Sequence, residues 1–448
     1  MEHKMRSSRI YSSPQFILSM FVLSLAMVFG GGQGTLGDTL TQLTAIVLLV
    51  LLYRKHPNLS KWPKSSLYAL IPLVPVLLFL LPLPNFLTDL GIARNDLRNS
   101  LNPVIGDLGG QSGLSTSAVE RALFWLLPAI AIYLSALQFN RQQKRLAIVV
   151  LLTWIFVGAV LGLAQKAGGL DSALYFYTNT NYGSAVGLFA NSNHYAISMA
   201  ASLPLIWAGL TVLFNQRSKK PVNPLWFVVY SGLAVLFILG FMLSGSRAGL
   251  ALGMFGCLLM LPAIILADEH KGAKHWLFAF LAVGLFFTVQ IGLYFISLKF
   301  ETDPLDDLRW QLFPITAQAA SQFGPWGSGP GSFWFVFPQY DNFLTGNVIA
   351  NHAHNDYIEL WLEMRWLFLI AALVACTAFL WQGVKIWFRS TGLEDESVLL
   401  ARSAWIGILL LLLHSAVDYP LRTTALSTMI ALFAAFLASV EAKAILDD

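Results

Sequence analysis

Long apolar runs, about twelve of them at bilayer-spanning length, constrain the fold of this chain more than any other feature. A helix needs roughly twenty apolar residues to cross the hydrocarbon core of a membrane. Charged residues make up 12% of the 448 residues, whereas soluble domains contain about a quarter. We therefore expect an all-α integral membrane protein with about 12 transmembrane helices, organised as one polytopic membrane domain over 1–448. The runs are 15–33, 38–53, 66–84, 119–139, 146–165, 193–214, 225–244, 247–267, 276–298, 361–382, 398–416 and 424–441.

The basic residues predict the orientation of these helices. With the N-terminus in the cytoplasm, every inside connection contains Lys or Arg, and no outside connection contains a basic cluster. This distribution follows the positive-inside rule, so we expect both termini to be cytoplasmic. The basic N-terminal residues before the first run resemble a signal peptide, but no small-residue cleavage site follows, which indicates a retained helix. The inside clusters are Arg54, Lys55, Lys61 and Lys64; Arg141, Lys144 and Arg145; Arg217, Lys219 and Lys220; Lys271 and Lys274; and Lys385 and Arg389.

The longest polar segment is the outside connection 299–360, which precedes the tenth run. We expect it to be partly helical at Asp306–Gln322 and then irregular, because the run 324–331 is rich in Gly and Pro. We also expect it to fold against the membrane over the junction Ser244–Arg247, which lies on the same predicted face.

The end of this connection concentrates groups that exchange protons or donate hydrogen bonds. His352, His354, Asn355, Asp356 and Tyr357 lie within six positions, directly before the chain turns apolar again. A histidine here could be a hydrogen-bonded structural group, a metal ligand or a general base, with Asp356 or another carboxylate orienting it. The spacing lacks the i, i+4 pattern of helical zinc motifs, and imidazole is suited to general-base work near neutral pH. The residues themselves do not decide whether His352 or His354 would be the base.

Two arginines and a second polar patch on the same face also have two interpretations. Arg247 stands at a helix end near the outer boundary, where it could anchor lipid phosphates or clamp a diphosphate through its guanidinium. Arg309 has neighbouring carboxylates, so a local ion pair is an equal alternative. Asn193 and His194 lie where the sixth run begins, and they could cap that helix or contact a substrate.

An ordered series of motifs across 189–422 resembles the O-antigen ligase and polymerase family of bacterial membrane glycosyltransferases. No single motif is specific, but their order on one predicted membrane face is. One departure stands out: the ligase motif has Gly ten residues after Asn355, and this chain has Arg365 there. The motifs are Phe189-Ala190-Asn191-Ser192-Asn193-His194, Ser244-Gly245-Ser246-Arg247-Ala248-Gly249, Arg309-Trp310, Gly327-Ser328-Gly329-Pro330-Gly331-Ser332-Phe333, His352-Ala353-His354-Asn355-Asp356-Tyr357 and His414-Ser415-Ala416-Val417-Asp418-Tyr419-Pro420-Leu421-Arg422.

The resemblance implies transfer of a glycan from an undecaprenyl-diphosphate carrier to an acceptor hydroxyl, at the periplasmic face of the inner membrane. It implies no cofactor, no metal and no nucleic-acid partner; the partners are the lipid-linked glycan, an acceptor glycan and membrane lipids. Matched by motif, His354 would be the base, and Arg247 and Arg309 would hold the diphosphate. The resemblance makes further substrate contacts of His352, Asn355, Tyr357 and Arg422. Arg365 departs from the motif but could bind phosphate if it is exposed, and Asn193 and His194 are substrate-contact candidates from their position at the start of the sixth run.

Three functions remain open at the level of sequence. A glycan polymerase or ligase fits the motifs, and the acceptor would be another carrier-linked repeat, a lipid A–core sugar or a protein side chain. A flippase of the same lipid-linked intermediates fits less well, because transporter sites lie near mid-membrane and the polar residues here gather at the outer boundary. A non-catalytic assembly protein is the third alternative.

Overall fold

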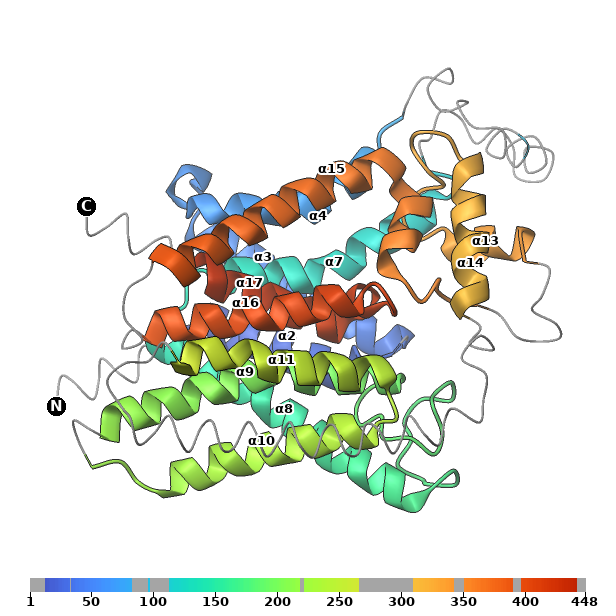
Figure 1. The fold of residues 1–448 in the computed structure, drawn as a ribbon. Helices are drawn as coiled ribbons and strands as arrows, with labels where there is room; N and C mark the ends of the chain where they lie inside the picture. The colour runs from blue at the N-terminus through green and yellow to red at the C-terminus, as the bar shows by residue number, and fades with distance from the viewer. Residues whose placement is uncertain are drawn as a thin grey trace.

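The computed structural model describes residues 13–32, 34–82, 96, 113–217, 221–265, 309–341, 350–389 and 396–440. Within these ranges the regular elements are helices, most of them aligned in one bundle (Figure 1). The bundle helices are α2 (Pro14–Phe29), α3 (Thr35–Lys55), α4 (Leu70–Leu78), α7 (Thr116–Ala136), α8 (Arg141–Gly168), α9 (Ser192–Arg217), α10 (Leu225–Leu243), α11 (Arg247–Ile265), α15 (Asp356–Val384), α16 (Glu396–His414) and α17 (Thr424–Ala438).

These helices confirm the all-α membrane architecture. Within the described ranges, seven helices are long and apolar enough to cross a membrane, and four apolar helices are shorter. Each predicted run except 276–298 overlaps one of the bundle helices; that run lies outside the described residues. The count of about 12 spans therefore stays a prediction.

The tenth helix begins at Asp356, five positions before the predicted 361. Hydropathy placed the boundary too late because the first turns of this helix are polar. Asn355 starts the helix by capping it: its side-chain Oδ1 accepts hydrogen bonds from the backbone N–H groups of Tyr357 and Ile358, at 3.0 and 3.1 Å.

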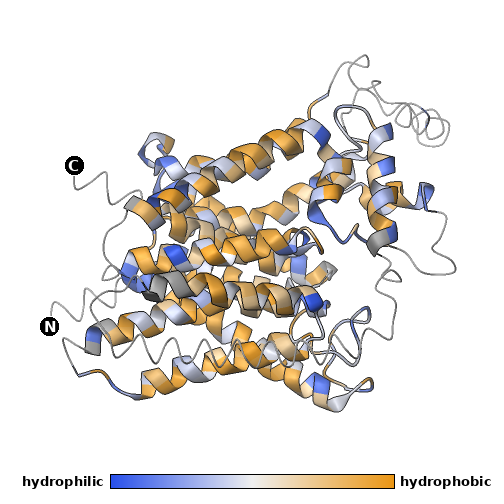
Figure 2. Ribbon diagram, viewed as in Figure 1, coloured by the Kyte–Doolittle hydropathy of each residue, from blue (hydrophilic) through white to orange (hydrophobic). Residues whose placement is uncertain are grey.

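From α2 to α11, and again from α15 to α17, successive bundle helices run in alternating directions, so the connections gather at two ends of the bundle. Hydrophobic residues cover the middle of the helices, and hydrophilic residues mark both ends (Figure 2). At one end, Lys144 donates to Ser439 and Arg145 pairs with Glu396. We call the opposite end, where α9, α11, α15 and α17 begin, the site end.

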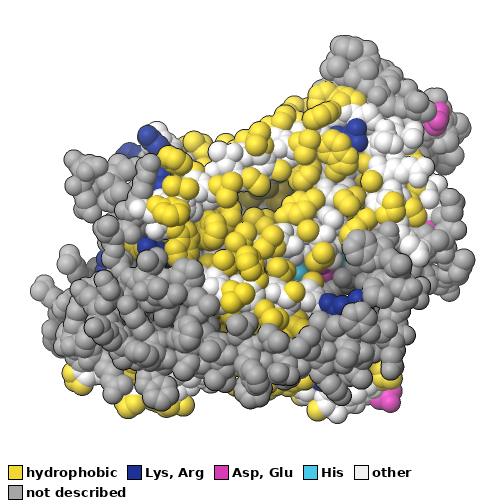
Figure 3. All heavy atoms as spheres, viewed as in Figure 1, with side chains coloured by type: hydrophobic (Ala, Val, Ile, Leu, Met, Phe, Trp, Pro, Cys, Tyr) yellow, Lys and Arg dark blue, Asp and Glu magenta, His cyan; other side chains and the backbone are white. Residues whose placement is uncertain are grey.

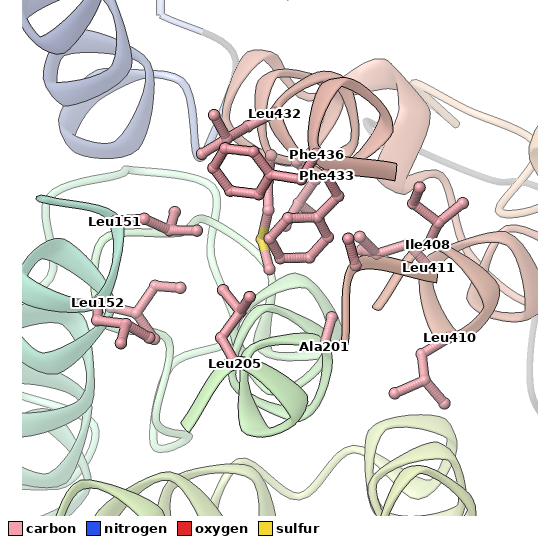
Figure 4. Packing of buried hydrophobic residues seen from close by; sticks show 14 of the residues in the cluster. Leu151, Leu152, Ala201, Leu205, Ile408, Leu410, Leu411, Leu432, Phe433 and Phe436 are labelled. Carbon is pink, nitrogen blue, oxygen red and sulfur yellow. The ribbon is translucent and has the colours of Figure 1, made fainter. Parts of the chain in front are cut away.

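The core that fixes this arrangement contains buried residues of α2, α3, α7, α8, α9, α10, α11, α16 and α17. Phe433 and Phe436 of α17 point toward Leu205 of α9 and Leu411 of α16 (Figure 4), and all four side chains are buried. Apolar side chains gain no hydrophobic free energy by leaving lipid, so close van der Waals packing holds such helices together. The beginnings of α9 and α17 and the end of α16 are thereby held at fixed relative positions.

Helix α15 is broken at Arg365, whose φ of 44° and ψ of −119° are not helical. The segment 325–329 satisfies the backbone groups at the break. Ser328 N–H donates to Leu362 O at 3.0 Å, and Gly329 N–H donates to Glu363 O at 2.8 Å. The approach is so close that a Cβ on Gly327 would lie 2.5 Å from Glu363 O, which is why a side chain cannot stand there.

The described part of the connection 299–360 contains α13 (Arg309–Gln322), α14 (Phe333–Val336) and a following 3₁₀ turn, Phe337–Gln339. Helix α13 lies within the segment predicted to be helical. In Figure 1 it crosses the bundle direction at the site end. The described part is tied to α15 and to the start of α7, since Leu114 N–H donates to Ser328 O at 3.1 Å. The predicted closure over Arg247 stays a prediction.

Candidate functional site

Asp418 is the centre of a buried polar cluster at the site end. Its carboxylate is fully buried and lies in the turn between α16 and α17. Asn193 Nδ2 donates to Oδ2 at 2.7 Å and Asn191 Nδ2 at 3.2 Å, while His354 Nδ1 lies 3.1 Å from Oδ1. Burial opposes ionisation, but the imidazoles of His194, His354 and His414 and the hydrogen bond from His354 hold the pKa of the Asp418 carboxyl well below its usual range. The cluster therefore contains a stable anion.

The Asp418 carboxylate sets the orientation of the His354 ring. With Nδ1–H donated to Oδ1, the tautomer places the lone pair on Nε2, the other ring nitrogen. The imidazole side chain is 25% exposed, whereas the carboxylate below it is not exposed at all. The backbone of His354 has a φ of 51°, a left-handed conformation that is uncommon for residues other than Gly. The result is an outward-facing imidazole with a buried anion behind it, which is the arrangement of a general base.

Tyr419 packs the histidines together. Its ring centroid lies 4.3 Å from that of His352, 4.7 Å from His194 and 4.9 Å from His354. His352 is buried, and its Nδ1 lies 2.9 Å from Glu359 Oε1. His352 is thus enclosed, and of these two candidate bases His354 is the more exposed.

Arg422 holds the first turns of α15 to the turn before α17. Its Nη2 lies 2.7 Å from Glu363 Oε2, and its Nε lies 3.6 Å from Glu359 Oε1 and 3.8 Å from Asp356 Oδ1. The three carboxylates are spaced along one face of α15. Burial opposes the charged guanidinium, but Glu363, Glu359 and Asp356 together raise the pKa of Arg422 above its ordinary value. These contacts hold the Arg422 guanidinium against α15, and its predicted contact with a substrate stays a prediction.

Arg247 is the first residue of α11 and its side chain is exposed. Ser246 caps the helix, since its Oγ accepts the N–H of Gly249 at 2.9 Å. The dipole of α11 opposes a cation at this end of the helix. A bound anion would be attracted by the Arg247 guanidinium and by the helix dipole together. A Cβ on Gly249 would lie 2.4 Å from Ala196 Cβ, so the first turn of α11 touches the turn of α9 that follows His194.

The structure thus brings together His352, His354, Asn355, Asn193 and His194 around Asp418 and Tyr419. Asn355 Nδ2 donates to Ala416 O at 2.8 Å, and Tyr357 Oη–H donates to Leu412 O at 2.6 Å. Arg365 stacks on Trp361, with 4.2 Å from Cζ to the ring centroid. Arg309 begins α13. The roles predicted for all these residues stay predictions.

Sequence reasoning assigned no role to Asp418, Tyr419, Glu359 or Glu363. It offered Asp356 or another carboxylate to orient the histidine, and in the structure Asp418, 64 positions from His354, contacts that ring. Asp356 instead accepts the N–H of Leu421 at 3.0 Å. The sequence did contain a signal for Asp418: it closely follows the apolar run 398–416, and an ionisable residue at the membrane is by default a candidate for a functional site. Among the described residues, no group of three or more His, Cys, Asp or Glu side chains is arranged to hold a metal ion.

An apolar cavity of about 490 Å³ lies beside the polar cluster, between α4, α7, α15, α16 and α17. Arg422, Thr423 and Thr424 belong to its wall at the site end, and Gln382 and Ala438 belong to its wall at the other end. Figure 3 shows the hydrophobic face over this region, hollowed near its middle, with histidine atoms reaching the surface below the hollow. Its wall is mostly apolar and extends along these helices from one end of the bundle to the other, which suits a lipid chain.

Comparison with known proteins finds a family match for part of the chain. Residues 232–373 match the family model described as O-Antigen ligase. This match, over about a third of the 448 residues, supports assignment of the chain to the O-antigen ligase/polymerase family. No curated protein matches the chain.

The matched segment contains Arg247, His354 and Arg365, and it lies inside the predicted motif region 189–422. Asn193, Asp418 and Arg422 lie outside the match, yet Asn193 and Asp418 belong to the same polar cluster as His354. The family supports a glycosyltransferase-like membrane enzyme that takes part in the transfer of surface polysaccharide.

Proposed function

We propose that this protein transfers a glycan from undecaprenyl diphosphate to an acceptor hydroxyl at the site end of the bundle. The observation that carries the proposal is the pair of His354 and Asp418: a part-exposed imidazole hydrogen-bonded at 3.1 Å to a fully buried carboxylate. The proposal also includes the orientation predicted above, with the site end in the periplasm, both termini in the cytoplasm and about 12 spans in the inner membrane.

His354 Nε2 takes the proton of the acceptor hydroxyl as that oxygen attacks the anomeric carbon of the donor. The new bond joins the acceptor oxygen to the anomeric carbon, and the bond from that carbon to the diphosphate oxygen breaks. The diphosphate leaves with the bonding electron pair, and attack from the opposite side inverts the anomeric centre. Asp418 stabilises the imidazolium that forms, as a carboxylate does in related acid–base pairs.

Arg247 and the N–H groups that begin α11 stabilise the diphosphate as it gains negative charge. Arg309 would supply a second guanidinium, as its motif predicts. Diphosphate is a good leaving group, so placement of the reactants and neutralisation of charge supply most of the catalysis. No step of this reaction needs a metal ion.

The apolar cavity suits the lipid anchor of one of the two substrates. Its wall at the site end contains Arg422 and Thr424, and Arg422 is tied through Glu359 to His352 in the cluster. An isoprenoid or acyl chain in the cavity would therefore end near the histidines. The acceptor is another carrier-linked repeat in a polymerase and a lipid A–core sugar in a ligase.

The test is reconstitution of the purified protein in liposomes with undecaprenyl-diphosphate repeat units, with and without lipid A–core. Longer glycans on the carrier alone would establish a polymerase, and product only with lipid A–core would establish a ligase. His354→Ala should abolish product. The matched control is His56→Ala, because His56 ends α3 at the opposite end of the bundle and should be dispensable.

Activity of His354→Ala equal to that of the native protein would refute the assignment of the base. The flippase alternative would be favoured if no new glycosidic bond formed under either condition although a cooperative unfolding transition showed that the protein was folded. Flippase activity would then be measured as movement of the lipid-linked glycan across the same liposomes.

A further inference from the structure

The connection between α8 and α9, residues 169–190, is built as a rigid surface next to the reaction centre. Helix α8 has 28 residues, so it is about 42 Å long at 1.5 Å per residue, against roughly 30 Å for the hydrocarbon core. With its basic first turn at the opposite headgroup layer, α8 carries its last turn through the headgroups of the site end. The connection that follows therefore starts outside the hydrocarbon.

Gln165, which is fully buried, fastens this connection to α8. Its Oε1 accepts the N–H groups of Gly187 at 2.7 Å and Val186 at 3.1 Å. Its Nε2 donates to Leu174 O at 2.9 Å and Gly187 O at 3.0 Å. The amide of Gln165 thus forms hydrogen bonds to two separate stretches of the 169–190 connection, at Leu174 and at 186–187. A surface held in this way loses little entropy when it binds a ligand.

Two aromatic rings project from this rigid connection. Phe176 is 64% exposed and Tyr182 is 48% exposed. Tyr182 is fixed in place by its hydroxyl, which donates to Thr178 O at 3.0 Å, and by an edge contact with Tyr175 at 5.1 Å between centroids. The side chains around them are mixed: Asn179 is exposed, Ala173 and Leu174 are exposed apolar residues, and Lys166 of α8 donates from Nζ to Gly183 O at 2.8 Å. Asp171 is the one charged residue in 169–190.

The connection is also tied to the polar cluster and to the α11 end. Asn181 Oδ1 accepts the N–H of Ser192, the first residue of α9, at 2.9 Å. Thr180 Oγ1–H donates to Ala190 O at 2.8 Å, one position before Asn191, which contacts Asp418. On the other side, a Cβ on Gly245 would lie 4.0 Å from Ser184 Oγ, two positions from Arg247.

From these observations we propose that the 169–190 connection is a glycan-binding surface, on which Phe176 and Tyr182 stack against sugar rings of a substrate. The proposal rests on the proposed function. A pyranose ring has an apolar C–H face and a rim of hydroxyl groups. The aromatic rings stack on the apolar C–H face of the sugar. Neighbouring amide and hydroxyl groups, such as those of Asn179 and Thr178, form hydrogen bonds with the sugar hydroxyl groups. The ligand is the glycan part of the donor or of the acceptor.

Membrane headgroups would use the same side chains differently. Insertion of a loop into the headgroup layer depends on its exposed apolar area, to which Leu170 contributes as well as Phe176, since its side chain is 70% exposed. Stacking on sugars depends on the flat face of an aromatic ring, which Leu170 lacks. The two modes of binding therefore respond differently to matched substitutions.

The experiment measures binding without turnover. The protein is placed in lipid nanodiscs in the His354→Ala background, and the probe is the oligosaccharide released from the lipid-linked repeat unit by mild acid. Saturation-transfer NMR reports its affinity. Phe176→Ala and Tyr182→Ala should each weaken binding by roughly fivefold to tenfold. Phe176→Tyr, Tyr182→Phe and the control Leu170→Ala should each stay within about twofold.

Equal losses for Leu170→Ala and Phe176→Ala, or unchanged affinity in both alanine variants, would overturn the proposal. Steady-state rates with His354 intact then separate the two sources. A higher KM for the carrier-linked glycan alone assigns the surface to the donor, and a higher KM for the acceptor alone assigns it to the acceptor. Oligosaccharide binding that depends on the rings, in a protein that forms no glycosidic bond, would refute the proposed transferase and leave the glycan-binding surface standing.

Discussion

Replacing Arg365 with glycine should leave the protein more stable than replacing it with alanine, although alanine is the better residue in a regular helix. The reason is the break in α15. Arg365 has a φ of 44° and a ψ of −119°, a conformation that favours Gly because a Cβ is crowded there. The break is enforced from outside the helix, since the segment 325–329 binds the carbonyl groups of Leu362 and Glu363. The family's glycine at this position has the same physical explanation.

The size of the difference follows from two opposing effects. A non-glycine residue held in such a conformation costs about 1–3 kcal/mol, and glycine loses about 0.5–1 kcal/mol more chain entropy on folding. Both variants lose the contact of the guanidinium with Trp361 at 4.2 Å, so that loss cancels in the comparison. Arg365→Gly should therefore be more stable than Arg365→Ala by about 1 kcal/mol.

The assay is reversible unfolding in mixed micelles of increasing denaturing-detergent fraction, followed by tryptophan fluorescence. Leu369 supplies the matched control, because it lies four positions later in the regular part of α15 and its side chain is 39% exposed. There the order must reverse, with Leu369→Gly less stable than Leu369→Ala by about 1 kcal/mol. If glycine is also the less stable residue at position 365, the backbone there is helical and the account of the break is wrong.

Further predictions concern the polar cluster and its supports. Asp418→Asn should lower kcat by about 10²–10⁴-fold with little change in KM, measured from initial rates; an unchanged kcat would contradict the pairing with His354. Arg422→Ala should lower the free energy of unfolding by about 3–5 kcal/mol, because it leaves the buried carboxylates of α15 without their cationic partner. Combining it with Glu363→Gln should cost less than the sum in the same unfolding assay. The pKa of Asp418 is held below the ordinary 3.8, so its stabilisation is complete above that pH and is lost as the pH falls toward the lower folded-state pKa; acid titration of Asp418→Asn should show a shallower loss than the native protein. Gln165→Leu should speed hydrogen exchange of the backbone amides in 169–190, with the exchange of α17 as the unaffected reference.

The sequence predicted the helices well because hydropathy reports the solvent that each run meets. It also placed Asn193, His194, His352 and His354 on one face, and the structure brings them into one cluster. That success has a simple cause: helices that span in alternating directions return alternate connections to the same end, so position along the chain determines which residues can meet.

Hydropathy could not predict which side chains from different helices contact one another. Asp418 joins His354 only because the core holds the beginning of α15 beside the turn before α17, where Asp356 N–H donates to Ser415 O at 2.9 Å. Hydropathy began the helix after Glu359, leaving Glu359 in the preceding connection and Glu363 in the first turn of the predicted run 361–382. Their pairing with Arg422 makes this stretch the first two turns of a buried helix.

The two charge groups at the site end also bear on how the substrates would approach under the proposed function. Arg422 faces three carboxylates on the α15 side, so that side holds its own cation and offers no net attraction to a diphosphate. The α11 side has the exposed Arg247 at a helix N-terminus, which attracts one. The donor diphosphate would therefore lie toward α11, and the apolar cavity on the α15 and α17 side is left for the lipid anchor of a lipid-linked acceptor. His354 belongs to the cluster between these two regions, so the acceptor oxygen would be deprotonated on the side away from the leaving group. Such an approach requires inversion at the anomeric carbon, and a product with the anomeric configuration of the donor would exclude it.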